Sequence, residues 1–338
     1  MPGYDTHYIF GIHSYRRIPD LDIKKYIDKS KGAYKLGLLG PDIFFYYATE
    51  IAAPRKNIGS YMHTRKTDLF FKNCIEYIIN TSGEQKYVAT SYLCGFLSHY
   101  VLDCNVHPFI YWMTNYTNKG KDYLEKHFSL ETDIDVLLLK TYLDKNPQDF
   151  FKNSQLILRD YEKTIIADML YYSIRHTYSH SRITRKGIKM AIVSVQKEHK
   201  MLHLLSSKMK NAIGTIETAF VGQKYIAPLI PGGSDISHPD PFNLSHSMWF
   251  NPWNTAISST EAIPDLLNKS REAYLTIIFL LDNFITNPDN EQALNVLMKT
   301  IGSKSYHSGL NWKIPSWYNS SIYKNGKIFL TGKYIYNI

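Results

Sequence analysis

The sequence predicts an all-α protein built from many helices, with a small β-hairpin near its C-terminus. Two patterns support this: helical spacing of apolar residues through most of the first 300 positions, and an Asn-Gly turn between β-forming residues at 322–329. The chain has 338 residues, enough to bury a sizeable core. Its 44% hydrophobic and 20% charged content excludes a disordered protein.

Several stretches carry helical patterning. Residues 66–80 place their apolar side chains on one side, whereas 87–107 are apolar on almost every side, which is typical of a central buried helix. Further helices are expected at 121–143, 155–178, 188–213 and 259–286, with a shorter one after Asn290.

Two segments depart from the helical pattern. Residues 220–258 contain five prolines and Gly232-Gly233, which predicts a long irregular segment, and such segments are more often functional than idle. Residues 301–338 contain five lysines and no acid, among tryptophans and tyrosines. We therefore expect a helical domain at 1–300 and a basic, aromatic-rich extension at 301–338 that includes the hairpin.

The net charge of +9 is uneven, because residues 181–211 hold eight Lys and Arg against Glu198 alone. This predicts either a solvated basic face or a surface for anionic partners, such as phospholipid headgroups, nucleic acid or phosphate esters. The longest apolar run, 273–281, is too short to span a membrane.

The N-terminus and the cysteines bear on location. Residues 1–15 lack the basic start and apolar stretch of a secretory signal. Cys74, Cys94 and Cys104 are an odd set without close pairing, which favours reduced thiols. Both observations predict a cytoplasmic protein, with export by another route left open.

The central predicted helix contains charged and polar residues that its apolar surroundings do not explain. His99, Asp103 and His107 recur every four positions, so all three project from one face. Burying them without partners would cost several kcal/mol. A bound metal ion removes this cost, because it binds neutral imidazole and ionised carboxylate.

The next helix repeats the pattern with His127, Glu131 and Asp135. Imidazole and carboxylate ligands without thiolate suit a catalytic zinc site between two facing helices. A single pair of this kind is more often a structural hydrogen bond, and Asp103 could orient a histidine rather than bind metal. Asp135 is the weakest member, since an exposed position at the helix end explains it equally well.

Three N-terminal residues complete the candidate set. His7 lies in the stretch 5–10, where taken alone it is more often a hydrogen-bonded core histidine than a ligand, and it ranks above the nearby His13. Asp42 follows Gly40-Pro41, where capping of a following helix is the simpler explanation. His63 is expected in a loop that leads into the helix at 66–80.

The order of these pieces resembles the zinc-dependent phospholipase C family. The motifs are Thr6-His7, LGPDI at 39–43, His63, GFLSHYVLD at 95–103, His107-Pro108 and HFSLE at 127–131. The resemblance covers roughly residues 1–143. It implies an all-α domain that holds two or three zinc ions in a cleft and hydrolyses a phosphodiester of a phospholipid on the glycerol side.

The resemblance also implies roles for these residues. His7 would bind one zinc ion shared through Asp103, while His63, His99, Asp42 and Asp103 would surround a second. His127 and Glu131 would hold the third with a further histidine, for which His107 is the best candidate. Asp42 would also be the catalytic base. If Met1 is removed, the amine of Pro2 could serve as another ligand, as in related fungal nucleases.

Three functions stay open on the sequence. The first is a zinc-dependent phospholipase C-type phosphodiesterase that contacts a membrane surface through its basic aromatic patches. The second is a zinc-dependent single-strand nuclease, since a basic chain suits nucleic acid. The third is a metal-stabilised helical module without catalysis.

Overall fold

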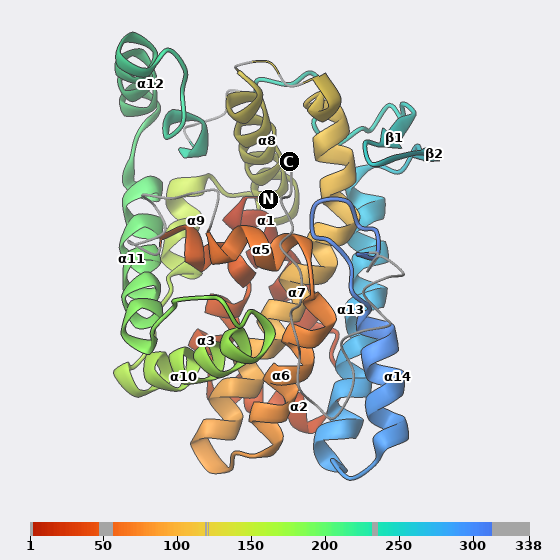
Figure 1. Cartoon of the computed structure of the whole chain (residues 1–338). Helices are drawn as coiled ribbons and strands as arrows, with labels where there is room; N and C mark the ends of the chain where they lie inside the picture. Colours follow the sequence, from red (N-terminus) through yellow and green to blue (C-terminus); the bar gives the residue numbers. More distant parts are fainter. Residues whose placement is uncertain (1–2, 47–56, 119, 121, 232–235, 313–338) are drawn as a thin grey trace.

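The computed structural model describes residues 3–46, 57–118, 120, 122–231 and 236–312. The described part is all-α apart from one two-stranded hairpin, as predicted (Figure 1). The elements in chain order are α1 (Tyr4–Arg16), α2 (Asp22–Lys29), α3 (Lys31–Gly37), the 3-10 helix η1 (Gly40–Tyr46), α5 (Ile58–Thr64), α6 (Thr67–Ile79), α7 (Gly83–Met113), η3 (Tyr116–Asn118), α8 (Tyr123–Leu143), α9 (Pro147–Ser154), α10 (Asp160–Thr177), α11 (Arg185–Leu204), α12 (Ser207–Val221), η4 (Ala227–Leu229), β1 (Trp249–Asn251), β2 (Asn254–Ser259), α13 (Ile263–Thr286) and α14 (Glu291–Ile301).

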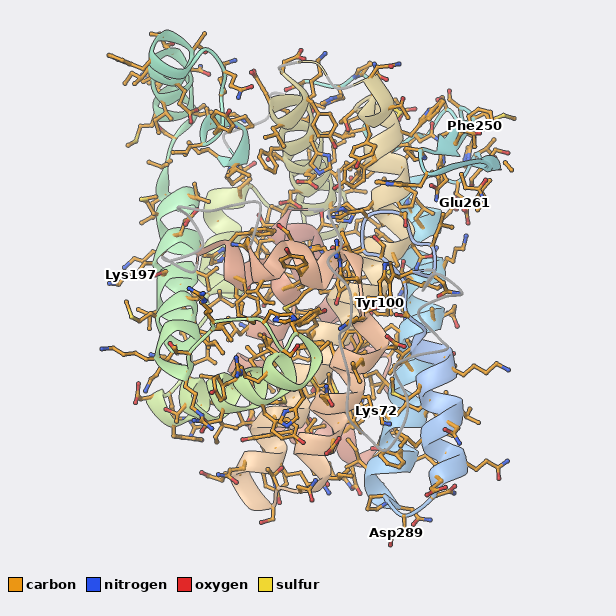
Figure 2. All side chains as sticks on the ribbon, in the orientation of Figure 1. Lys72, Tyr100, Lys197, Phe250, Glu261 and Asp289 are labelled. Carbon is orange, nitrogen blue, oxygen red and sulfur yellow. The ribbon has the colours of Figure 1, made fainter. Side chains whose placement is uncertain are left out.

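Helix α7 is the centre of the fold. It packs against α1, α2, α3, α6, α10 and α13, and nearly every side chain from Val88 to Tyr111 is buried. The labelled Tyr100 lies in the interior in Figure 2, where its hydroxyl donates to the Ile301 carbonyl at 2.9 Å. The all-round apolar pattern of this segment therefore predicted the central helix correctly.

Helix α7 is longer than the predicted 87–107, because it continues through Pro108 to Met113. Other helix ends differ for local reasons. The predicted helix 188–213 is two helices, since the Ser206 hydroxyl accepts from the Met209 amide and caps a new start. The predicted 155–178 helix begins only at Asp160, where the Glu162 side chain accepts from the Arg159 amide.

Two local expectations at the N-terminal candidates were wrong. Asp42 lies within η1 and does not cap an α-helix, and the η1 amide of Asp42 donates to the Leu39 carbonyl at 3.0 Å. His63 lies in the short helix α5 rather than in a loop, and the Asn57 side chain caps α5 by accepting from the Gly59 amide. Both residues are consequently held by hydrogen-bonded backbone.

The irregular segment 220–258 contains a hairpin that the sequence did not predict. Strands β1 and β2 pair antiparallel around Pro252-Trp253, and Trp249 packs against Phe109 of α7. The predicted helix 259–286 begins instead at Ile263, since Ser259 belongs to β2. The hairpin predicted at Asn325-Gly326 lies outside the described residues.

The segment 302–312 returns across α7 after α14. The Tyr306 amide donates to the His63 carbonyl at 2.8 Å, and the Asn251 side chain of β1 donates to the Ser308 carbonyl at 2.8 Å. Gly309 has φ +65°, and a Cβ there would lie 2.2 Å from the Cys104 carbonyl oxygen. Only glycine therefore allows this close approach to α7.

Two sequence expectations about the chain as a whole can be compared with the fold. No described helix is both long enough and apolar enough to cross a membrane. Cys74, Cys94 and Cys104 are buried free thiols, as their spacing predicted.

Candidate metal centre

The structure brings all eight predicted ligand residues together. In three buried groups, one imidazole nitrogen or carboxylate oxygen from each residue lies within 4.8 Å of the others, which is close enough to hold a metal ion. The groups are His7, His99 and Asp103; Asp42, His63 and His99; and His107, His127 and Glu131.

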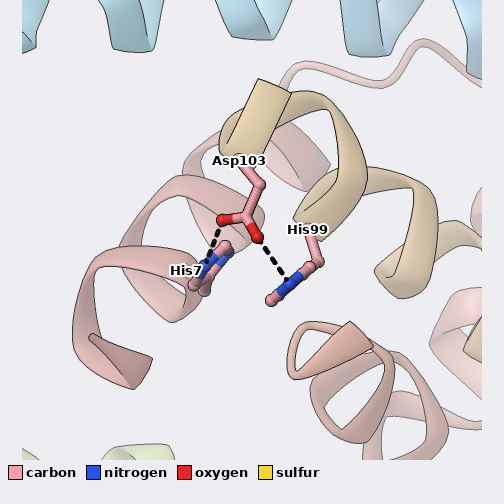
Figure 3. A group of neighbouring side chains, drawn as sticks. All are labelled: His7, His99 and Asp103. Carbon is pink, nitrogen blue, oxygen red and sulfur yellow. Dashed lines mark ion pairs between the residues drawn. The ribbon is translucent and has the colours of Figure 1, made fainter. Parts of the chain in front are cut away.

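The first two groups share His99. Its Nε2 lies 3.0 Å from Asp103 Oδ2 and 3.7 Å from Asp42 Oδ2. Asp103 Oδ1 lies 3.2 Å from His7 Nε2, so this carboxylate joins α1 to α7 (Figure 3). On the other side, Asp42 Oδ1 lies 3.1 Å from His63 Nε2. His99 of α7 therefore belongs to two adjacent ligand groups.

The third group lies one turn further along α7. Glu131 Oε1 lies 3.0 Å from His127 Nε2 and 3.7 Å from His107 Nε2. His107 Nδ1 is also 3.5 Å from Asp103 Oδ2, which connects this group to the first. The four-residue repeat on α7 therefore aligns the groups along a single face.

Backbone carbonyls orient three of the histidines. The Nδ1 atoms of His63, His99 and His107 lie 2.7, 3.0 and 2.8 Å from the carbonyl oxygens of Gly59, Leu38 and Tyr306. A carbonyl only accepts, so each Nδ1 carries a hydrogen, and Nε2 is the ring atom left to bind a metal ion. Metal-binding histidines commonly have such a partner behind the ring.

Gly40 makes room for His99. It has φ +52°, and a Cβ at this position would lie 2.4 Å from His99 Cδ2. Residues other than glycine would be strained by the left-handed conformation and would also displace the imidazole. The motif 39–43 therefore shapes two sites at once, through Gly40 and Asp42.

Burial shifts the pKa of three of the ligand residues, His7, His107 and Glu131. Burial, reinforced by the neighbouring His99, lowers the pKa of His7 to about 4, and burial lowers the pKa of His107 well below its ordinary value. Both rings are neutral near pH 7, the form that binds metal. Burial raises the pKa of Glu131 well above its ordinary value, so its ionised form needs a nearby cation.

Comparison with known proteins identifies the family of the chain. The family model described as zinc-dependent phospholipase C matches residues 6–179, more than half of the chain. The chain belongs to the zinc-dependent phospholipase C family. Curated proteins and solved structures give no match. The family is one of hydrolases, which supports an enzyme, and the match spans all eight candidate ligand residues.

The donor set fits the zinc that this family requires. Eight buried ligand-type atoms form no hydrogen bond with the described part of the chain; they are both ring nitrogens of His7, both carboxylate oxygens of Asp42 and of Asp103, and the Nε2 atoms of His99 and His107. Buried polar atoms are normally hydrogen-bonded, so such a concentration at one place calls for a cation. Imidazole and carboxylate are zinc ligands.

Three other sequence candidates are outside the groups. Asp135 is buried, not exposed, and its Oδ1 accepts from the Thr6 amide at 2.8 Å, so it caps the first turn of α1. His13 lies beside Tyr142, with 6.1 Å between the ring centroids. The Pro2 amine lies outside the described residues.

His307 is a site residue that the sequence reasoning missed. Its ring centroid lies 5.5 Å from that of His63, 6.0 Å from that of His107 and 5.4 Å from that of Tyr111. Unlike the buried ligand histidines, it is only half-buried. No spacing rule links position 307 to α7, and the family match ends at residue 179.

The β1–β2 turn adds an aromatic group beside the third site. Trp253 lies 4.6 Å from Tyr116 and 5.0 Å from Tyr111 between ring centroids, and Tyr111 lies 4.8 Å from His127. Rings this close fill the space between them, so the group offers a surface rather than an open cage. The irregular segment thus does reach the metal centre.

Proposed function

We propose that this protein hydrolyses a phospholipid at the headgroup phosphodiester, on the glycerol side, and releases the phosphorylated headgroup. Membership of the zinc-dependent phospholipase C family supports the substrate class. The observation that carries the proposal is the set of three histidines whose Nδ1 atoms are held by backbone carbonyls while Nε2 faces buried carboxylates.

The proposed zinc ligands are the eight residues of the three groups. Bound zinc would supply Lewis-acid stabilisation of the phosphoryl charge and would acidify water. Asp42 is the proposed general base, since both its oxygens are buried at the second group and form no hydrogen bond there. It would take the proton from the attacking water at Oδ1 or Oδ2 as the water oxygen bonds to phosphorus. The bond from phosphorus to the glycerol oxygen would break, and diacylglycerol would leave once that oxygen takes up a proton.

His307 is the proposed contact for the phosphoryl group. It is half-buried while the neighbouring His63 and His107 are buried, so a substrate arriving from solvent would meet its ring. An imidazole N–H donating to a phosphoryl oxygen would hold the phosphorus near the ligand groups. Tyr306, whose amide and carbonyl are both hydrogen-bonded, would keep the neighbouring backbone in place.

The test is headgroup release from phosphatidylcholine vesicles by the zinc-loaded protein, with single-stranded DNA assayed in parallel. We expect headgroup release that a chelator removes and zinc restores, and that Asp42→Asn lowers at least about 100-fold. The matched control is Asp122→Asn, which changes an exposed carboxylate paired with Lys126.

Three results would contradict the proposal. Headgroup release that is unchanged by the chelator would exclude zinc chemistry. Cleavage of DNA without cleavage of lipid would indicate a nuclease. Zinc-dependent thermal stability without cleavage of either substrate would make it a metal-stabilised helical module. The cytoplasmic location stays a prediction.

A further inference from the structure

The larger apolar side chains of helix α12 lie on its solvent-facing side, whereas a helix packed on a core buries its apolar side. Met209, Ile213, Ile216 and Phe220 fall within an arc of about 60° at 100° per residue. Phe220, Ile216 and Met209 are 86%, 58% and 47% exposed, and Ile213 between them is half-buried. We call these four residues the α12 stripe.

The polar side of α12 faces the protein. Lys210, Asn211, Gly214 and Thr218 line a cavity of about 780 Å³ whose far wall includes Glu125 and Ser129 of α8. This cavity is not the metal centre, since positions 125 and 129 lie on the side of α8 opposite to His127 and Glu131. The helix is thus amphipathic with its polar side inward.

Polar contacts hold α12 in this orientation. Glu217 accepts from the amides of Tyr225, Ile226 and Ala227, which ties the helix to the segment that follows it. That segment is fixed to α8 by Lys224, whose Nζ lies 2.9 Å from Glu125 Oε1. These contacts hold the helix without using the α12 stripe, which is left at the surface.

The neighbouring helix adds positive charge. Lys186, Lys197 and Lys200 share the outer side of α11, within an arc of about 60°, and all three are exposed. Figure 2 shows Lys197 at the outer edge of this helix. Met190 and Met201, 54% and 53% exposed, lie on the same side among the lysines. Lysines interleaved with apolar side chains suit a surface that is both anionic and apolar.

We propose that α11 and the α12 stripe dock this protein on an anionic phospholipid surface. The apolar side chains would enter the boundary between headgroups and acyl chains, and the lysines would contact lipid phosphates. A second copy of the chain fits less well, because a symmetric contact would oppose lysine to lysine. The inference rests on the proposed function only in taking a phospholipid surface as the place of the substrate.

Vesicle binding measures the docking directly, with bound protein rather than released headgroup as the readout. The full-length, zinc-loaded protein is sedimented with vesicles of phosphatidylcholine, with and without phosphatidylserine. We expect stronger binding when phosphatidylserine is present and weaker binding in high salt. Ile216→Ser with Phe220→Ser should weaken binding about tenfold or more, and Lys197→Glu with Lys200→Glu should remove the preference for phosphatidylserine.

The matched control places the same kind of change elsewhere. Phe279→Ser with Val296→Ser alters side chains of α13 and α14 that are 57% and 45% exposed, and it should leave binding unchanged. The proposal would be overturned if the control variant and the variant with Ile216→Ser and Phe220→Ser bound vesicles equally weakly. It would also be overturned if changing the α12 stripe did not weaken binding. A third result would also overturn it: the protein is a dimer in analytical ultracentrifugation, the variant of the α12 stripe is a monomer, and neither binds vesicles.

The outcome is separable from that of the proposed function. Hydrolysis of a short-chain phospholipid below its micelle concentration needs no docking surface, so the α12 variant should hydrolyse it at the wild-type rate. Vesicle binding without any hydrolysis would contradict the proposed function and leave the docking intact. Hydrolysis of the soluble lipid without vesicle binding would overturn the docking alone.

Discussion

Gly40 is the single residue on which the position of His99 depends most directly. Gly40→Ala adds a Cβ that would lie 2.4 Å from His99 Cδ2, on a backbone with φ +52°. The matched control is Gly83→Ala, since Gly83 has φ +55° and nothing within 4 Å of the added carbon. We expect Gly83→Ala to lose about 1–2 kcal/mol of unfolding free energy from the left-handed backbone, and Gly40→Ala to lose more, because its Cβ would also overlap His99.

Only Gly40→Ala should also lose zinc, because His99 belongs to two ligand groups. Denaturant unfolding and metal content by mass spectrometry measure the two effects. Equal zinc content in the two alanine variants would contradict the dependence of the His99 ligand position on Gly40.

His307 is tested by replacing its ring with an apolar side chain that cannot donate a hydrogen bond. His307→Leu should lower kcat/KM for headgroup release by about 10- to 100-fold, the loss expected for one hydrogen bond to a charged group. Zinc content should not change, since His307 is outside the three ligand groups. His176→Leu is the control, because His176 is an exposed histidine whose Nδ1 bonds the Tyr172 carbonyl. Unchanged kinetics with His307→Leu, or a loss of zinc, would contradict a role in phosphoryl binding.

At the scale of an element, the start of α1 depends on a buried acid in α8. Burial and the nearby Asp5 raise the pKa of Asp135 to about 7 in the folded protein, against an ordinary value of 3.8. Between these values the folded protein holds a proton that the unfolded chain has released. The contribution of Asp135 to stability is therefore complete below about pH 4 and is lost as the pH rises toward 7.

Asp135→Asn keeps an oxygen to accept from the Thr6 amide but removes the ionisable group. The variant should gain stability relative to the wild type as the pH rises from about 4 to 7. Urea unfolding at several pH values in this window measures the difference between the two proteins. A difference that is independent of pH would mean that Asp135 titrates alike in the folded and unfolded states.

At the scale of the whole molecule, the ligand groups connect α1, η1, α5, α7 and α8. Removing zinc should therefore destabilise the entire domain and not one helix. Zinc at a concentration about a thousandfold above its Kd adds about 4 kcal/mol for one ion, which for a chain of 338 residues corresponds to a fall in Tm of about 6 °C on chelation. Differential scanning calorimetry before and after chelation, and after return of zinc, tests this. An unchanged Tm would contradict metal ions as the partners of the buried carboxylates.

Local patterns predicted much of this protein. An i, i+4 repeat puts side chains on one face of any helix, so the stripes of α7 and α8 could be read from the sequence, together with the apolar surround of α7. Zinc binding by these residues stays a prediction. The limits of α10, α11 and α13 were missed, because single caps such as Ser206 override an extended apolar pattern.

The sequence by itself determined the all-α fold class and the polar positions within the buried helices, since both follow from the helical period. Tertiary structure alone decided that His99 joins two ligand groups, that the Tyr306 carbonyl orients His107, and that His307 lies between sites. The outward position of the α12 stripe was decided in the same way, because Glu217 ties α12 to the segment that follows it and Lys224 ties that segment to α8. Periodicity says which side chains share a face of a helix, but only the packing of distant segments says what that face meets.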